Sequence, residues 1–200
     1  MSAWILPVIG AVLVVAFGLI AAAIAAKNAE NLSKCGLDVD LCRIVAIAVQ
    51  DEGMDRPCVW LSASDLDERD ALRRFWLIAE GAHLIGFNCL GFDLPVLFRR
   101  SLYLGVPTPR IVIDKFKHPQ VTDLMQVLSF NGALRLRGLA FYAKRFGFAV
   151  DDDLTGADIA GAVAEGRWAE IHAHVSADVQ RTALLAAKLG VFHLSLVGMR

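Results

Sequence analysis

The first 26 residues carry no charged side chain, and this constrains the fold more than any other feature of the sequence. Residues 3–26, AWILPVIGAVLVVAFGLIAAAIAA, form a run of 24 uncharged residues, and a helix needs about 20 to cross a bilayer. No Lys or Arg precedes the run, so a cleaved signal peptide fits less well. Lys27 and Lys34 follow it. The pattern predicts a transmembrane helix that anchors a cytoplasmic body in the inner or plasma membrane.

Two other interpretations of this segment stay open. Residues 11–17, AVLVVAF, have the composition of a buried strand, which a helix over 21–34 would follow. Alternatively, a local reading-frame disruption or a misassigned start has replaced the natural segment. We expect an apolar helix that projects from the body, and we divide the chain into an N-terminal segment, 1–26, and a body, 27–200.

The body has the charge content of an ordinary soluble domain. The chain carries 20 Lys and Arg against 21 Asp and Glu, a formal net charge of -1. This balance by itself rules out no class of partner, but it gives no overall electrostatic case for nucleic acid, so any such binding needs a local basic patch. The four cysteines have no C-x-x-C or zinc-ligand spacing, which predicts reduced thiols; they are Cys35, Cys42, Cys58 and Cys89.

Hydrophobic patterns in the body predict a mixed α/β domain. The expected strands are 43–49, its hairpin partner 58–61, and 83–87. The expected helices are 65–80, 94–104, 121–130, 134–146 and 168–189. Asp65 is expected to cap the first of them, whose apolar face would be Leu66, Leu72, Phe75, Trp76 and Ala79. The acidic residues 151–153 are expected to form a solvated loop.

Two short stretches carry residues suited to chemistry. In IGFNCLGFDLPVL, residues 85–97, a strand leads through a glycine-bearing loop to Asp93 at the start of a helix. The structural interpretation of Asp93 is an N-cap. In the last helix, His174 and Asp178 are four residues apart and share one face. Such a pair is either a surface contact or a general base beside a metal ion.

Taken together, these stretches resemble a known family. The order G-F-N-x-x-x-F-D-x-P, then D-L-M at 123–125, then H-x-x-x-D-V-x-x-T is similar to the DEDD-type 3′–5′ exonucleases of the RNase H-like fold. The nearest resemblance is to the exonuclease domain of family B DNA polymerases in a stand-alone form. It covers about residues 21–190, and it implies a mixed sheet flanked by helices.

The resemblance also implies a reaction and a set of site residues. Members hydrolyse phosphodiesters at a single-stranded 3′ end, with DNA the most typical substrate. Four carboxylates hold two Mg²⁺ or Mn²⁺ ions. Here Asp93 and Asp178 would be metal ligands, and His174 would stand where the family usually has a tyrosine as general base. Asn88 and Phe92 would contact the nucleic acid.

One part of the family pattern is missing. The family opens with a strand that ends in D-x-E, but no Asp or Glu precedes Glu30 in this chain. Asp51 and Glu52 are adjacent and are expected to form a hairpin turn. The sequence therefore predicts a homologue with impaired hydrolysis.

Two alternatives remain. One is a membrane-anchored protein with a cytoplasmic exonuclease-like domain. The other is an inactive nucleic-acid-binding module whose basic residues contact phosphates; these would be Arg99, Arg100, Arg110, Lys115, Lys117, Arg135, Arg137, Lys144 and Arg145.

Overall fold

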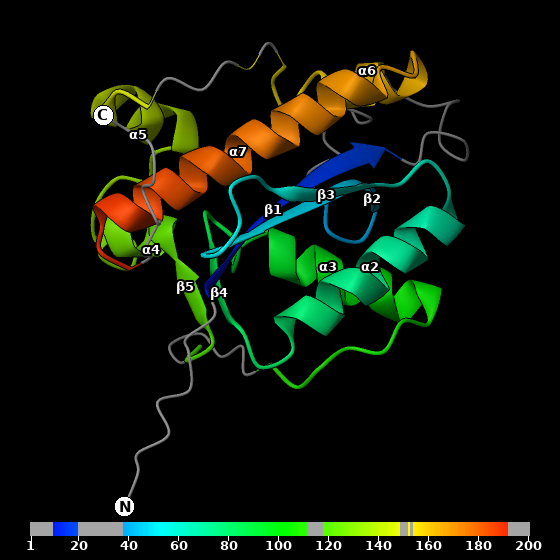
Figure 1. Cartoon of the computed structure of the whole chain (residues 1–200), viewed down its shortest axis with the longest axis horizontal. Coiled ribbons are helices and arrows are strands. Elements are labelled where there is room, and N and C mark those ends of the chain that lie inside the picture. Colours follow the sequence, from blue (N-terminus) through cyan, green and yellow to red (C-terminus); the bar gives the residue numbers. More distant parts are fainter. Residues whose placement is uncertain (1–9, 20–37, 112–117, 149–151, 153, 192–200) are drawn as a thin grey trace, which may run out of the picture.

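A single mixed sheet with helices on both faces organises the molecule (Figure 1). The computed structural model describes residues 10–19, 38–111, 118–148, 152 and 154–191. Within them, the sheet has five strands in the order β3-β2-β1-β4-β5. Their bounds are β1 Gly10–Leu19, β2 Cys42–Asp51, β3 Cys58–Leu61, β4 His83–Gly86 and β5 Val121–Asp123. The predicted mixed α/β class is confirmed.

Strand β1 is the central strand of the sheet. It pairs antiparallel with β2 from Ala11↔Asp51 to Leu19↔Cys42, and parallel with β4 from Gly10↔His83 to Leu13↔Gly86. Strand β3 extends the sheet antiparallel to β2, and β5 extends it parallel to β4. Strands β1, β4 and β5 therefore run in the same direction, toward the edge where the loop after β4 begins.

The predicted transmembrane helix over 3–26 is wrong, because residues 10–19 form β1. The open alternative, a strand over 11–17, is confirmed. An uncharged, β-branched run suits both a bilayer and a central strand covered on two faces, and hydropathy measures only transfer out of water. None of the helices in the described part of the chain has the length and apolarity to cross a membrane. The predicted helix over 21–34 lies outside the described residues.

A bulge in the β1–β2 pairing shifts the alternation of side chains along β2. Ala16 pairs with Ala46 but Phe17 pairs with Ile44, so Val45 is the extra residue. As a result, Val45 and Ala46 both enter the same core cluster, while Ile44 belongs to the cluster on the opposite face.

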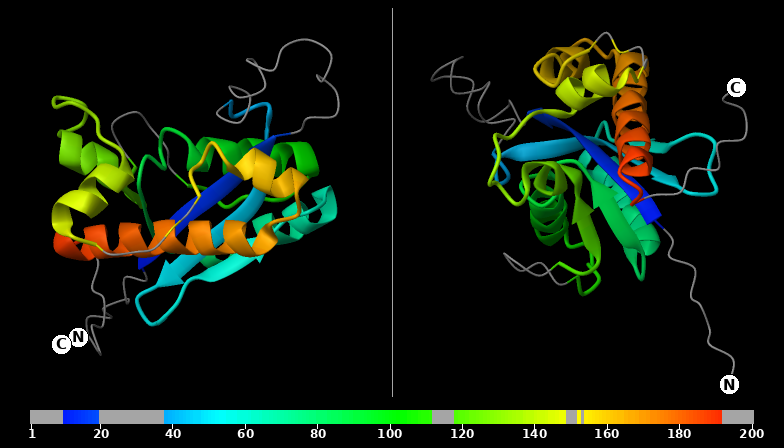
Figure 2. Two further views of the ribbon diagram at one scale, coloured as in Figure 1. Left: turned by 90° about the horizontal axis from the view of Figure 1, so that it is seen from above. Right: turned by 90° about the vertical axis from the view of Figure 1, so that its left-hand side faces the viewer.

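Two helical layers cover the sheet (Figures 1 and 2). On one face, α2 Asp65–Ala79 and α3 Asp93–Leu104 pack on β2. On the other face, α7 Trp168–Lys188 crosses β2 and β1, next to α6 Ile159–Ala164. Helix α4, Leu124–Ser129, follows β5 directly, and α5, Leu139–Phe146, packs against α7. Each face has its own apolar core.

The predicted helix 65–80 is confirmed, with two local corrections. Ser64, not Asp65, is the N-cap, because its hydroxyl accepts from Asp67 N–H and the Asp67 carboxylate accepts from Ser64 N–H. Leu66 does not belong to the buried face and is 72% exposed, whereas the other four predicted residues are buried.

Two other helix predictions had wrong boundaries. Residues 121–130 divide into β5 and α4, because Asp123 ends the strand and caps the helix through Met125 N–H. The helix predicted over 134–146 begins only at Leu139. Helix α6 was not predicted. The three cysteines that the structure describes, Cys42, Cys58 and Cys89, are free thiols as expected.

Candidate functional site

The loop between β4 and α3 is held in place by Asp123, a buried residue of β5. Its carboxylate accepts from the backbone N–H groups of Asn88 at 2.9 Å and Leu90 at 3.0 Å, and from Met125 N–H at 3.0 Å. Because three backbone N–H groups donate to its two oxygens, this carboxylate is buried without losing hydrogen-bond partners. Asp123 therefore positions the loop that carries the predicted site residues, a role that the sequence did not reveal.

Asn88 has a backbone conformation that presents its side chain outward. Its φ is 59°, in the left-handed region that asparagine tolerates better than most residues. Gly91 lies under its amide, since a Cβ added there would be 2.6 Å from Asn88 Oδ1. The loop thus needs both residue types: asparagine for the positive φ and glycine for the close approach.

Phe92 and Asp93 form the start of α3. Phe92 occupies the N-cap position and makes no side-chain cap hydrogen bond, and its half-buried ring packs on the core beside α2 and α3. Asp93 is the first helical residue and is 9% exposed, so its predicted N-cap role is wrong. Burial raises the pKa of the Cys89 thiol well above its usual value, and the carboxylates of Asp123 and Asp93 raise it further. The carboxylates of Asp93 and Asp123 therefore both disfavour ionisation of the buried Cys89 thiol.

His174 and Asp178 lie together on α7, as their spacing predicts. His174 Nε2 is 3.9 Å from Asp178 Oδ2. The other ring nitrogen, Nδ1, is 3.0 Å from both oxygens of Asp152. The imidazole is therefore held between two carboxylates, and Asp152 fixes its orientation. The Asp152 side chain is 4% exposed, so the expectation that this acid lies in a solvated loop is wrong.

Arg181 links these two carboxylates. Its Nη1 donates to Asp152 Oδ2 at 2.7 Å and to Asp178 Oδ1 at 2.9 Å. Arg181 and Asp178 are three residues apart on α7, a spacing that brings side chains into contact. The sequence therefore contained a signal for this pair, although it gave none for the contact with Asp152.

The two carboxylates have pKa shifts of opposite direction. Burial raises the pKa of Asp178, against the opposing effect of His174 and Arg181. Burial also acts to raise the pKa of Asp152, but hydrogen bonds from Arg181 and His174 outweigh it and lower that pKa. Asp152 is therefore the stronger acid of the two, and Asp178 is the carboxylate that resists ionisation.

The residues that the structure describes do not fit a two-metal centre. Strand β1, GAVLVVAFGL, contributes no carboxylate to the middle of the sheet. Asp178 and Asp152 share the guanidinium of Arg181, so a divalent cation would have to compete with this positive group for the same oxygens. Across the described ranges, no three His, Cys, Asp or Glu side chains are grouped so that they could hold a metal ion. The convergence of Asp93 and Asp178 on shared metal ions stays a prediction.

Several other predicted residues have structural roles. Asp51 and Glu52 form the expected hairpin turn, in which Asp51 Oδ1 accepts from Glu52 N–H at 2.7 Å. Arg100 is buried and donates to both oxygens of Glu68, so its predicted contact with phosphate is wrong. Arg99 pairs with Asp40 at 2.6 Å at the surface. Lys115 and Lys117 lie outside the described residues.

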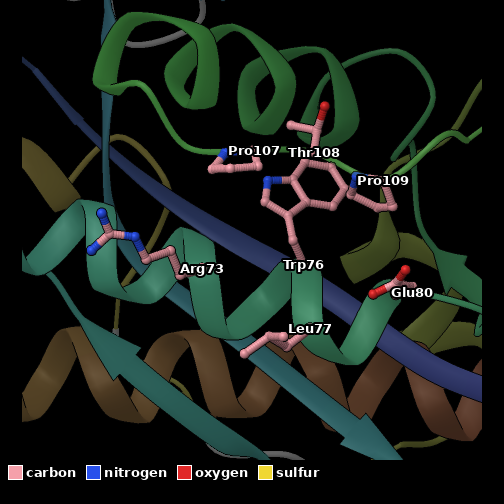
Figure 3. Close-up of a pocket in the computed structure, with 7 residues that line it drawn as sticks. All are labelled: Arg73, Trp76, Leu77, Glu80, Pro107, Thr108 and Pro109. Atoms are coloured by element: carbon pink, nitrogen blue, oxygen red, sulfur yellow. The ribbon is translucent and has the colours of Figure 1, made fainter.

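Two cavities differ in their relation to these residues. A cavity of about 370 Å³ is lined by Asn88 together with residues of α4 and the turn after it. A second, of about 460 Å³, lies between α2 and residues 107–109, where the Trp76 ring stands between Pro107 and Pro109 (Figure 3). None of the predicted site residues lines the second cavity. The first is therefore the cavity of interest for binding.

Comparison with known proteins agrees with the fold and the motif order. A family model described as a predicted 3′–5′ exonuclease related to the exonuclease domain of PolB matches residues 37–197. The structure is similar to that of the family B DNA polymerase from the hyperthermophilic archaeon Pyrobaculum calidifontis, with a TM-score of 0.68 and 20% identity. The similarity covers 92% of this chain and 25% of the polymerase.

A search of curated sequences finds no match. The polymerase likeness, at its low identity, shows a shared fold, and this chain spans about a quarter of that protein. The family model, in contrast, covers most of the chain. The chain belongs to the family of predicted 3′–5′ exonucleases related to the exonuclease domain of PolB.

Proposed function

We propose that this chain binds the single-stranded 3′ end of a nucleic acid, most typically DNA, and that its ability to hydrolyse that end is severely weakened. One observation carries the proposal: the central strand β1 has no carboxylate. The hydrogen bond from Arg181 to the carboxylate of Asp178 supports it. Family members would use both positions to hold Mg²⁺ or Mn²⁺. The protein would therefore keep the ability to bind a strand while its ability to hydrolyse that strand is severely weakened.

The loop after β4 supports the binding part of the proposal. Asp123 fixes this loop through two backbone hydrogen bonds, and the loop holds Asn88 at the mouth of the 370 Å³ cavity. An exposed amide that can both donate and accept suits a nucleotide. Asn88 would contact the terminal nucleotide and Phe92 would support the loop from the core side. The order of strands β3-β2-β1-β4-β5 supports the RNase H-like assignment.

The cluster on α7 supports the loss of hydrolysis. Arg181 forms charge-assisted hydrogen bonds with both carboxylates, so one of their two negative charges is balanced and each has a donor within the protein. A divalent cation would have to displace Arg181 from Asp178, and it would find no partner ligand on β1. His174 would then position Asp152 and Asp178 rather than activate water.

Binding to a labelled single strand tests the proposal. Fluorescence anisotropy of the purified full-length protein is compared for a linear DNA strand with a free 3′ end and for a circular single strand of the same composition. We expect tighter binding to the linear strand, and a loss of about tenfold with Asn88→Ala.

Thr108→Ala is the matched control, because Thr108 is a small polar residue that lines the other cavity. It should bind like the unmodified protein. Equal binding of linear and circular strands would contradict recognition of the 3′ end. Absence of binding to either strand would contradict the proposed function as a whole.

A further inference from the structure

The stretch 124–148 is rich in positive charge and in exposed apolar side chains. It contains four cationic residues and no Asp or Glu, although the whole chain is nearly neutral. Three of its phenylalanines are exposed, and Phe130 is the most exposed at 72%. We define the basic-aromatic surface by Phe130, Arg135, Arg137, Phe141, Lys144 and Arg145, all of them exposed.

We propose that single-stranded nucleic acid runs along the basic-aromatic surface, with phosphates on its cations and bases stacked on Phe130 and Phe141. This inference rests on the proposed function, because the surface would be the path along which a bound strand reaches Asn88. Proteins that bind single strands combine a positive groove with aromatic rings in this way. Stacking on a ring is possible for every base, so the surface would accept any sequence.

The backbone around Phe130 holds this ring outward in a rarely adopted conformation. Phe130 and the next residue, Asn131, have φ values of 52° and 55°, which bulky side chains seldom adopt. Two hydrogen bonds of the turn stabilise this backbone conformation. Asn131 N–H donates to Gln126 O at 2.8 Å, and Gly132 N–H donates to Ser129 Oγ at 3.1 Å. Phe130 is the C-cap of α4, where the left-handed conformation ends the helix, and it leaves the aromatic ring exposed to solvent.

A series of ring contacts connects this surface to the loop after β4. The guanidinium of Arg137 lies 4.9 Å from the centre of the Phe141 ring. Phe141 meets Tyr142 edge to face at 5.3 Å, and Tyr142 lies 6.1 Å from Phe87, the residue before Asn88. The cavity of about 370 Å³ fills the same region, since Asn88, Asn131 and Leu136 all line it. A strand on the surface would therefore have its end at this cavity.

The charges of the surface are available to a ligand. None of its four cations forms an ion pair with an acid in the described part of the chain. The acids of the neighbouring helix α7 and of the segment before it, Asp178 and Asp152, are already bound to Arg181. A protein partner would favour an apolar centre depleted in charge, whereas here four exposed cations accompany two exposed rings. Charge complementarity therefore favours a polyanion that also has flat apolar faces.

Salt-dependent binding to single-stranded DNA tests this inference. Anisotropy with a labelled strand of about 12 nucleotides is measured over a range of salt for the full-length protein and for the double variant Arg135→Ala/Arg137→Ala. We expect the double variant to bind about tenfold more weakly at low salt, with a log–log salt slope smaller by about 1.4, which is 0.7 for each lost phosphate contact.

A second double variant, Phe130→Ala/Phe141→Ala, tests stacking. Its affinity should fall by at least about fivefold with an unchanged salt slope, because rings contribute no counterion release. The control Arg73→Ala/Arg74→Ala removes the same charge from exposed positions on α2, across the sheet, and should leave both affinity and slope unchanged. Thermal unfolding by circular dichroism confirms that each variant is folded.

The outcomes separate the two proposals. If the unmodified protein binds the strand and the surface variants bind equally well, the inference is wrong and the proposed function stands. If the α2 control loses as much as Arg135→Ala/Arg137→Ala, binding is a general charge effect and the inference is also wrong. If the unmodified protein binds no single strand, while vesicles or a protein partner bind this surface, both proposals fail.

Discussion

At the scale of single residues, two neighbouring arginines of α3 show how context decides the role of a charge. Arg99 is exposed and pairs with Asp40 at the surface. Arg100 is buried and forms a two-fold hydrogen-bonded pair with Glu68, whose Oε1 also accepts from Ile44 N–H at 3.0 Å. The pair ties α2 and α3 to β2. Sequence alone cannot separate two adjacent arginines, because both have the same composition around them.

The two arginines give a matched pair of stability variants. Arg100→Ala should lower the free energy of unfolding by about 3–5 kcal/mol, because it removes both short hydrogen bonds to the buried Glu68 carboxylate and leaves only Arg43, at 3.7 Å, as a charged partner. Arg99→Ala removes only an exposed pair and should change it by less than about 1 kcal/mol. Urea denaturation followed by circular dichroism measures both. Equal effects of the two variants would show that the Glu68 pair does not connect the layers as described.

The opposite pKa shifts of Asp152 and Asp178 predict opposite pH dependences. The pKa of Asp152 is lowered from 3.8, so the stability from its charge is present above 3.8 and is lost as the pH falls through the folded-state pKa. The pKa of Asp178 is raised, so its contribution is complete below 3.8 and is lost as the pH rises through the folded-state pKa.

Urea denaturation from pH 7 to pH 3 tests these signs. The destabilisation caused by Asp152→Asn should shrink on acidification. The free-energy difference between the unmodified protein and Asp178→Asn should instead move in favour of the unmodified protein. Parallel changes for the two variants would contradict the assignment of Asp152 as the stronger acid.

The sequence identified some site residues and could not identify others. His174 and Asp178 were predictable because helical spacing places residues four apart on one face. Asp152 was not, since its partners His174 and Arg181 lie 22 and 29 residues further along the chain. The role of Asp123 was also hidden, because its carboxylate binds backbone groups of a distant loop, and such groups have no sequence signature.

At the scale of elements, β1 explains why the N-terminal prediction failed. A charge-free segment is compatible both with a transmembrane helix and with the central strand of a covered sheet. Only the presence of strands that pair with it distinguishes the second from the first. Those partners, β2 and β4, lie 23 or more residues later in the chain than the end of β1 at Leu19. By contrast, β2, β3, α2 and α7 were predicted well because each has a long periodic pattern or clear boundary residues.

Errors at two shorter elements have local causes. Strand β5 has three residues and ends at Asp123, whose capping signal made residues 121–130 resemble the beginning of one helix. The residues before Leu139 alternate apolar and basic side chains, which also fits an amphipathic helix. In the structure they are exposed and non-helical, and they supply part of the basic-aromatic surface.

Truncation tests the place of β1 in the sheet. A chain that begins at residue 20 lacks the strand that pairs with both β2 and β4. We expect this chain to aggregate or to lose cooperative unfolding, because two strands would keep unpaired backbone groups in the interior. Size-exclusion chromatography and thermal unfolding measure the effect against the full-length chain. A folded, monomeric product with unchanged cooperativity would show that residues 10–19 are an appendage.

At the scale of the whole molecule, a mixed sheet with helices on both faces carries the motifs, and the proposed loss of hydrolysis rests on two of its elements. The loop after β4 and the long helix α7 follow the strands and the chain order expected from the motifs. The two elements are the central strand, which lacks carboxylates, and α7, where Arg181 holds Asp178. The account therefore requires that binding of a strand and its cleavage be separable in this protein.

A single-turnover assay on a bound strand tests that requirement most directly. Protein in excess is mixed with a DNA strand labelled near its 3′ end, binding is confirmed by anisotropy in the same sample, and Mg²⁺ or Mn²⁺ is added before products are resolved by electrophoresis. The account predicts that the bound strand stays intact. Stepwise loss of 3′ nucleotides that Asp93→Ala abolishes would contradict it, and would mean that the chain assembles a metal centre without a carboxylate from β1.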